Sequence, residues 1–194
     1  MSESDGELME RCKSGDISAF DLIVQKHKVP LINFVYRFVG NQETAEDLTQ
    51  ETFIRIYKNI KSYRKDMAEL RTWMYRIATN LCKNELRSRS RRSKILVGLA
   101  VGDQNHSGDP IEDALDPSAG PDRQLEEKEL QEILSQAILC LPEKMRAVLI
   151  LRDIEGMPYE EISRIVSKPV GTVKSRINRA RLMLKGKMAA YMQA

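Results

Sequence analysis

Near the C-terminal end of the chain, four polar side chains have the types and spacing needed to read DNA bases. They are Ser175, Asn178 and Arg179, on one face of a predicted helix, and Lys174, which flanks that face. Arginine and lysine can bond the edges of guanine in the major groove, and asparagine can bond adenine. Arg176 lies in the same basic segment. The chemistry that these residues suggest is recognition of a base sequence.

A helix-turn-helix pattern would position those side chains. A short predicted helix over 159–166 is followed by a break at 167–169, which contains Pro169, and by a second helix over 170–187. Such a second helix packs on the first and enters the major groove, while Arg164 and Arg181 suit phosphates better. A surface helix with a solvated basic face is the alternative, but the break and the Gly-Thr start favour DNA binding. The predicted inner face holds Val173, Ile177, Ala180 and Leu184.

A second predicted helix, over 42–60, has an unusual outer face. That face gathers Asp47, Gln50, Glu51, Ile54 and Lys58, opposite an inner face of Ala45, Leu48, Thr52, Phe53, Ile56 and Ile60. An isoleucine among acids is typical of a protein-binding patch with an apolar centre and a polar rim. One exposed apolar residue is also ordinary on any surface, so the pattern by itself leaves both interpretations open.

The segment 63–92 combines basic and aromatic residues. Its predicted core stripe is Leu70, Met74, Ile77 and Leu81, and the stripe beside it is Arg76, Asn80, Lys83 and Arg87, with Tyr63, Trp73 and Tyr75 interleaved. Cations that follow a backbone and rings that stack on bases suit single-stranded nucleic acid. A lone tryptophan in a helical domain more often belongs to the core, so we expect Trp73 to be partly structural.

The net charge of +3 conceals an uneven distribution of charges. Residues 83–94 are strongly basic, residues 95–122 contain six acids and no lysine or arginine, and residues 162–194 contain eight basic residues and no acid. Two basic blocks separated by an acidic one indicate two surfaces for polyanions, joined by a segment that does not bind the same polyanion.

Helical periodicity extends over nearly the whole chain and predicts an all-α fold. We expect two small helical domains, 1–95 and 123–194, joined by a flexible acidic linker over 96–122 that is rich in Gly, Pro, Asp and Ser. Pro30, Pro142 and Pro158 are expected where helices begin. The predicted helices span 5–14, 17–28, 30–39, 42–60, 69–89, 123–140, 143–155, 159–166 and 170–187.

Several function classes are excluded by what the sequence lacks. It contains no nucleophile–base pair, no metal-ligand spacing and no phosphate-binding glycine loop, so we expect neither an enzyme nor a bound cofactor or metal. Three separated cysteines without a CxxC pair argue for reduced, mostly buried thiols. The longest apolar run, 95–101, is too short to cross a membrane, and the acidic start is unlike a signal peptide. We therefore expect a cytoplasmic protein without membrane insertion.

Three segments together resemble the extracytoplasmic-function (group IV) sigma factors of bacterial RNA polymerase, within the sigma-70 family. Similarity to the family's region 2.2 is carried by AEDLTQETFIRIYKNI (45–60), and similarity to regions 2.3 and 2.4 by LRTWMYRIATNLCKNELRSRSRR (70–92). Similarity to region 4 is carried by LPEKMRAVLILRDIEGMPYEEISRIVSKPVGTVKSRINRARLML (141–184), where GTVKSR after YEEI is the most specific signal. The resemblance implies a subunit that binds core RNA polymerase and directs promoter-specific initiation, as in a stress response.

The resemblance also implies a role for each group of residues. The face with Asp47, Gln50, Glu51 and Ile54 would dock on the β′ clamp of core polymerase, which would also contact the chain through its β subunit. The −10 element would be opened and held by Tyr63, Trp73, Arg76, Asn80, Lys83 and Arg87. The −35 element would be read by Lys174, Ser175, Arg176, Asn178 and Arg179. The acidic linker would thread through the polymerase, and an anti-sigma factor would hold the protein inactive.

This sequence departs from the family pattern at a few positions. Ser163 stands where alanine is frequent, Ser167-Lys168 where the turn often has glycine, Leu70 where an aromatic residue is frequent, and Asn84 where aspartate is frequent. These changes affect the expected promoter preference rather than the membership of the family. Two other classes remain as alternatives: a free-standing helix-turn-helix regulator that binds duplex DNA without polymerase, and an RNA-binding or adaptor protein.

Overall fold

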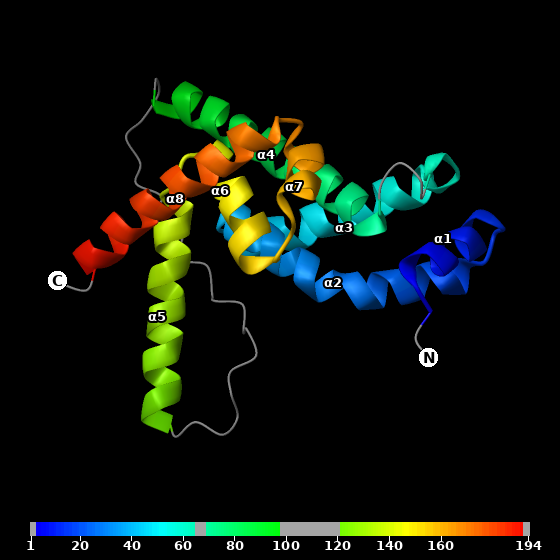
Figure 1. Cartoon of the computed structure of the whole chain (residues 1–194), viewed down its shortest axis with the longest axis horizontal. Helices are drawn as coiled ribbons and strands as arrows, with labels where there is room; N and C mark the ends of the chain where they lie inside the picture. Colours follow the sequence, from blue (N-terminus) through cyan, green and yellow to red (C-terminus); the bar gives the residue numbers. More distant parts are fainter. Residues whose placement is uncertain (1–2, 65–68, 98–120, 192–194) are drawn as a thin grey trace.

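The computed structural model describes residues 3–64, 69–97 and 121–191, without the side chains of 93–97, 121–129 and 190–191. All regular elements in those ranges are helical, as predicted (Figure 1). They are α1 (Asp5–Lys13), α2 (Ile17–Val39), α3 (Gln42–Lys58), the 3-10 turn η1 (Ile60–Ser62), α4 (Leu70–Val97), α5 (Pro121–Leu139), α6 (Glu143–Leu149), the π-helical turn η2 (Ile150–Ile154), α7 (Tyr159–Val166) and α8 (Val170–Tyr191).

The helix starts follow local capping chemistry. The side chain of Asn41 caps α3 by accepting a hydrogen bond from the Thr44 N–H at 2.8 Å. Gly40, which precedes it, ends α2 in the left-handed conformation with a φ of 76°. A Cβ at Gly40 would also lie 2.8 Å from the Cδ1 of Leu139, so α5 approaches α2 closely there. The left-handed φ is what favours glycine here, and any Cβ would also force the Leu139 side chain to move.

The predicted break at Pro30 is wrong, because α2 continues through this proline from Ile17 to Val39. A proline inside a helix removes one hydrogen bond and costs about 3 kcal/mol. Ile23 and Leu31, on either side of Pro30, are both fully buried in the core. Packing of one long apolar face against the other helices therefore offsets the local cost of the proline.

The predicted helix over 143–155 is instead α6 followed by the wider turn η2. In η2 the Glu155 N–H donates to the Ile150 carbonyl at 2.9 Å, a spacing of five residues. Single π-helical turns often occur at functional sites. The turn ends with the Glu155 carboxylate against α4, where it takes part in the contacts described below.

Residues from both predicted domains belong to one contiguous cluster of buried side chains. Phe34 of α2 and Ile150 of η2 are each 0% exposed and lie in that cluster. Helix α2 contacts α5, α6 and η2, and α4 packs along α7 (Figure 1). The proposed limits of the domains stay a prediction. Most of the predicted linker lies outside the described residues.

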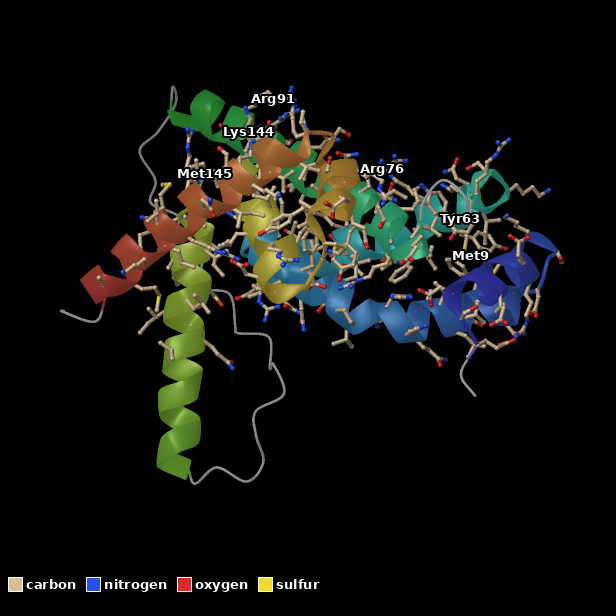
Figure 2. The ribbon with its side chains drawn as sticks, viewed as in Figure 1. Met9, Tyr63, Arg76, Arg91, Lys144 and Met145 are labelled. Carbon is tan, nitrogen blue, oxygen red and sulfur yellow. The ribbon has the colours of Figure 1, made fainter. Side chains whose placement is uncertain are left out.

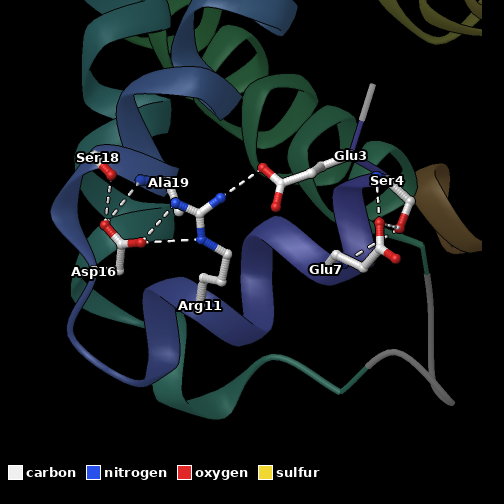
Figure 3. Close-up of polar contacts among 7 residues, drawn as sticks. All are labelled: Glu3, Ser4, Glu7, Arg11, Asp16, Ser18 and Ala19. Carbon is white, nitrogen blue, oxygen red and sulfur yellow. Dashed lines mark hydrogen bonds and ion pairs between the residues drawn. The ribbon is translucent and has the colours of Figure 1, made fainter. Parts of the chain in front are cut away.

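A carboxylate holds the turn between α1 and α2 (Figure 3). Asp16 accepts hydrogen bonds from the Ser18 hydroxyl at 2.6 Å and from two nitrogens of Arg11 at 3.0 and 2.7 Å. It also caps α2 by accepting from the Ala19 N–H. The hydrogen bond from Ser18 has the largest effect on the pKa of Asp16, followed by the hydrogen bonds from Arg11, and together they lower it from 3.8 to about 2. The turn therefore favours the charged form of this carboxyl group.

We expect the stabilisation by Asp16 to be complete above a pH of about 4 and to be lost as the pH falls toward 2. The reason is that the unfolded chain takes up the proton before the folded one does. The Arg11→Ala and Ser18→Ala variants should each move the Asp16 titration midpoint, measured by carboxyl-carbon NMR, toward 3.8. A midpoint that stays near 2 in both variants would mean that these side chains do not bind the carboxylate in solution.

Candidate nucleic-acid interface

Helix α8 separates an apolar face from a polar one, as predicted. Val173, Ile177 and Ala180 are at most 1% exposed and pack on α6 and α7. Because the buried face fixes the rotation of α8 about its axis, the opposite side of the helix points to solvent along its first three turns. The exposed polar residues are Lys174, Ser175, Asn178 and Arg179, with Arg176 half-buried beside them. The arrangement gives a polar surface free to meet a DNA groove.

The turn between α7 and α8 has a special backbone conformation at Ser167. Its φ of 52° and ψ of 52° are left-handed, and no other described residue except glycine has a positive φ. This conformation is costly for a residue with a Cβ. The Ser163 hydroxyl donates to the Lys168 carbonyl at 2.6 Å, while the Lys168 N–H donates to the Ser163 carbonyl at 3.1 Å. The turn keeps the helix-turn-helix geometry without the glycine that the family often has there.

Two cations of this segment already have partners within the chain. Arg181 donates to both oxygens of Asp153, one of them at 2.9 Å, so it is tied to η2 rather than free for a phosphate. The Lys174 ammonium lies 5.3 Å from the centre of the Tyr159 ring, which supports it by a cation–π contact. Arg164 is exposed on α7. Of the two residues predicted to contact phosphates, Arg164 and Arg181, Arg164 is therefore the one more available to bind DNA.

The outer face of α3 has the exposure that the sequence predicts. Asp47 and Gln50 are exposed, Ile54 is 38% exposed, and Glu51 forms an ion pair with Arg55 at 2.7 Å. The predicted inner residues Ala45, Thr52, Phe53, Ile56 and Ile60 are buried, and Leu48 packs partly against the core.

Gln50 and Ile54 also line a mostly apolar groove between α2 and α3, with a volume of about 760 Å³. The groove continues onto Ile17, Phe20 and Tyr57, which sequence reasoning missed. Tyr57 follows Ile54 by three residues, a spacing that places both on one side of a helix and could have identified it. The patch is therefore wider and more apolar than the four predicted residues alone.

The aromatic residues of the 63–92 segment are more buried than its basic ones. Tyr63 is 5% exposed and packs on Trp73, with ring centres 5.5 Å apart, and Tyr75 is 1% exposed. Trp73 is half-buried, which agrees with the expectation that it is partly structural. Arg76, Asn80 and Arg87 are exposed along α4 and Lys83 is half-buried. Figure 2 shows Arg76 and Arg91 on this helix.

The two basic surfaces lie close together in this arrangement. Burial lowers the pKa of Lys83, and the positive charges of Arg87 and Arg176 lower it further, while Glu143 acts in the opposite direction. Arg176 belongs to α8 and Lys83 to α4, so a residue predicted for the −35 element lies within electrostatic range of one predicted for the −10 element. The sequence gives no sign of this proximity.

Hydrogen bonds join α4 to η2 and α7. The Glu155 carboxylate accepts from the Tyr75 hydroxyl and, at 3.3 Å, from Arg71, which also donates to the Glu155 carbonyl at 2.6 Å. The Thr72 hydroxyl donates to Glu161 at 3.0 Å. Burial and the negative charge of Glu155 raise the pKa of Tyr75, which stays protonated and able to donate. Sequence reasoning assigned no role to Glu155.

The described part of the chain offers few features for other chemistry. It contains no group of three or more His, Cys, Asp or Glu side chains placed to hold a metal. None of its helices is long and apolar enough to cross a membrane. Cys12 and Cys82 are buried thiols and Cys140 is an exposed one.

Two family models match the chain. The Sigma-70 region 2 model matches residues 23–92, which include α3 and the basic side of α4. The Sigma-70, region 4 model matches residues 131–184, which include α7 and most of α8. Together they cover the three segments on which the resemblance rests.

Relatives and solved structures agree with these matches. The chain is 40% identical over 179 residues to the RNA polymerase sigma-H factor of Pseudomonas aeruginosa, across 92% of this chain and 91% of that one. It is 36% identical over 190 residues to the ECF RNA polymerase sigma-E factor of Haemophilus influenzae, across 97% of each.

Two solved structures have a similar fold at 22% identity. They are CnrH in complex with the cytosolic domain of CnrY (TM-score 0.68, 97% of this chain and 99% of that one) and the sigma factor RpoE of Bartonella quintana in complex with the anti-sigma factor NepR (TM-score 0.67, 88% and 96%). The two family models and the alignments to the relatives cover nearly all the residues of the surfaces described above. The chain therefore belongs to the sigma-70 family of RNA polymerase sigma factors, in its extracytoplasmic-function class.

Proposed function

We propose that this sigma factor directs core RNA polymerase to promoters through three separate surfaces. The outer face of α3 and the adjoining groove dock on the β′ clamp, the basic side of α4 holds the melted −10 element, and α8 reads the −35 element, while the β subunit completes the contact with polymerase. The segregation of α8 into a buried apolar face and an exposed polar face supports this most directly. Its polar residues have the types that read bases in the major groove.

On α4, the exposed cations would contact DNA and the aromatic pair of Tyr63 and Trp73 would support them. Arg76, Asn80 and Arg87 would follow the backbone of the single strand, with Lys83 beside them. Trp73 would present its accessible edge to a base, and Tyr63, which is buried against it, would hold the indole in place. Unstacking a base costs a few kcal/mol, which these contacts would offset.

The role requires binding alone, so we assign no catalytic step to the chain and place its action in the cytoplasm, where promoters and polymerase are. The two solved structures named above are complexes with a second protein, and in one of them that protein is named as an anti-sigma factor. We include an anti-sigma factor among the proposed partners. The apolar groove on α2 and α3 offers a surface for either protein.

Run-off transcription from a promoter library tests the proposal. Core polymerase is assayed with and without the full chain, and new start sites that share paired −35 and −10 sequences are the expected result. Binding of duplex DNA by the chain alone, without any new start site, would favour a free-standing regulator instead.

Replacing Ile54 by aspartate should weaken binding to core polymerase. A hot-spot residue at the centre of an interface contributes about 2 kcal/mol or more, which is roughly a thirtyfold change in Kd. Fluorescence anisotropy of the labelled chain gives the affinity. Leu22→Asp is a matched control, because Leu22 is 42% exposed on α2 and does not line the groove. Loss of the helical circular-dichroism spectrum in Ile54→Asp would place Ile54 in the core and contradict the docking role.

A further inference from the structure

A second pocket lies between α4 and the helix-turn-helix, apart from the apolar groove. Its volume is about 510 Å³, within the range of about 300–1,000 Å³ that is usual for small-molecule sites. Helix α4 contributes Trp73 and Arg76, and the other wall consists of Ser163, Arg164, Ser167 and Lys168. Residues more than 80 positions apart in the sequence therefore face one cavity.

The charge of the pocket favours an anion. Arg76, Arg164 and Lys168 all line it, and none of these three has an acidic partner within 4.0 Å among the described residues. The neighbouring carboxylates are already bound: Glu161 accepts from Thr72, and Glu155 accepts from Tyr75 and Arg71. Two guanidinium groups and an ammonium group at one cavity fit the oxygen atoms of phosphate groups.

The backbone of the pocket wall is a second, independent observation. Ser167 has the left-handed conformation that glycine adopts without cost, and it lines the cavity. Strain of this kind is concentrated at functional sites, where a side chain is needed in spite of its cost. The Ser167 hydroxyl would supply a hydrogen-bond donor that a glycine turn lacks, whereas the Ser163 hydroxyl already donates to the Lys168 carbonyl.

The aromatic wall narrows the class of ligand. Trp73 lines the pocket beside the cations, and nucleic-acid bases stack favourably on aromatic side chains. A ligand with phosphates at one end and an aromatic ring at the other matches this arrangement. Promoter DNA fits less well, because Arg76 belongs to the surface proposed for the −10 element and Arg164 to the helix-turn-helix proposed for the −35 element, whereas one small ligand can contact both in the packed structure.

We propose that this pocket binds a nucleotide, whose phosphates contact Arg76, Arg164 and Lys168 and whose base lies against Trp73. The bound nucleotide bridges α4 and α7 and stabilises their packed arrangement. It also occupies Trp73 and Arg76, so it competes with the single strand of the −10 element. This last consequence rests on the proposed function, whereas binding itself does not.

Trp73 is the one tryptophan of the chain, so its fluorescence reports on this pocket directly. The full chain, without polymerase, is titrated with ATP, GTP, CTP and UTP, and with pyrophosphate and the four nucleosides. We expect saturable quenching by at least one nucleotide with a Kd below about 1 mM. Arg164→Ala and Lys168→Ala should each weaken that binding by about tenfold. Lys144→Ala, which removes an exposed cation outside the pocket, should leave it unchanged.

The Ser167→Gly variant separates the effect of Ser167 on stability from its effect on nucleotide binding. It should raise the melting temperature by relieving the left-handed strain, yet weaken nucleotide binding by removing a hydroxyl. The nucleotide site is contradicted if none of the four nucleotides binds, or if Arg164→Ala and Lys168→Ala bind as tightly as the original chain. Pyrophosphate that binds as tightly as the nucleotides would reduce the pocket to a simple anion site. A short single-stranded DNA with the same dependence on Arg164 and Lys168 would make the pocket part of the DNA path and overturn the proposal.

Discussion

Replacing Arg146 by methionine should lower the free energy of unfolding by about 3 kcal/mol. The guanidinium of Arg146 is buried and donates to the carbonyl oxygens of Phe38, Leu139 and Leu141, the last at 3.0 Å. A hydrogen bond to a charged donor contributes about 1.5–3 kcal/mol. Loss of the guanidinium also leaves buried carbonyl groups without a hydrogen-bond donor, which is unfavourable. Burial lowers the pKa of Arg146, and this desolvation opposes the gain. Methionine has a similar length but no donor.

Urea unfolding followed by circular dichroism measures the effect, with an unchanged m-value showing that only stability has altered. The stability of Arg146→Lys should lie between those of Arg146→Met and the original chain. A lysine ammonium keeps the charge but lacks the planar set of N–H donors that a guanidinium offers to several carbonyls. Lys144→Met is the matched control on the same helix, where an exposed side chain should change stability by less than about 0.5 kcal/mol. Equal midpoints for Arg146→Met and the original chain would show that the three hydrogen bonds contribute nothing net.

Arg179→Ala should lower transcription from −35-dependent promoters and relax the preference at one base position. Arg179 is exposed on α8, opposite the buried face that fixes the rotation of this helix. A base contact by arginine is typically worth about 1–3 kcal/mol of discrimination, which corresponds to a change of about 5- to 150-fold. The promoter library with core polymerase measures this as a change in the distribution of start sites.

The matched control for Arg179 is Lys185→Ala, which removes an exposed cation farther along the same helix. It should leave sequence preference unchanged. If Arg179→Ala instead weakens all promoters equally and lowers the salt dependence, Arg179 contacts a phosphate rather than a base. If Arg179→Ala changes neither the distribution of start sites nor the rates of transcription, Arg179 does not contact DNA.

Most of the helices and their inner faces could be predicted from the sequence, because the signals are local. Three- and four-residue spacing identified the buried side of α8 through Val173, Ile177 and Ala180. The caps at Asp16 and Asn41 were readable from residue type alone. Pro30 shows where such rules fail, since packing of the long apolar face of α2 overrides the local preference of a single residue.

The sequence was less informative about the aromatic residues of the predicted −10 surface. Interleaved rings and cations suggested that Tyr63 and Tyr75 accompany the basic side of α4, but both are buried. The Tyr75 ring packs against Phe34 in the core, and its hydroxyl donates to Glu155, which is 80 residues away in sequence and follows a π-helical turn. No periodicity within either segment indicates that contact.

By itself, then, the sequence determined an all-α chain of the sigma-70 family, the buried side of its helices and the residue types that suit DNA and polymerase. These follow from the helical repeat, from capping and from motifs, all of which extend over a few turns. Only the tertiary structure decided that α4 packs along α7, that Lys83 lies near Arg176, and that Arg76 and Arg164 line one pocket. Those features depend on contacts between residues distant in sequence, which form only when the helices bury their apolar faces together.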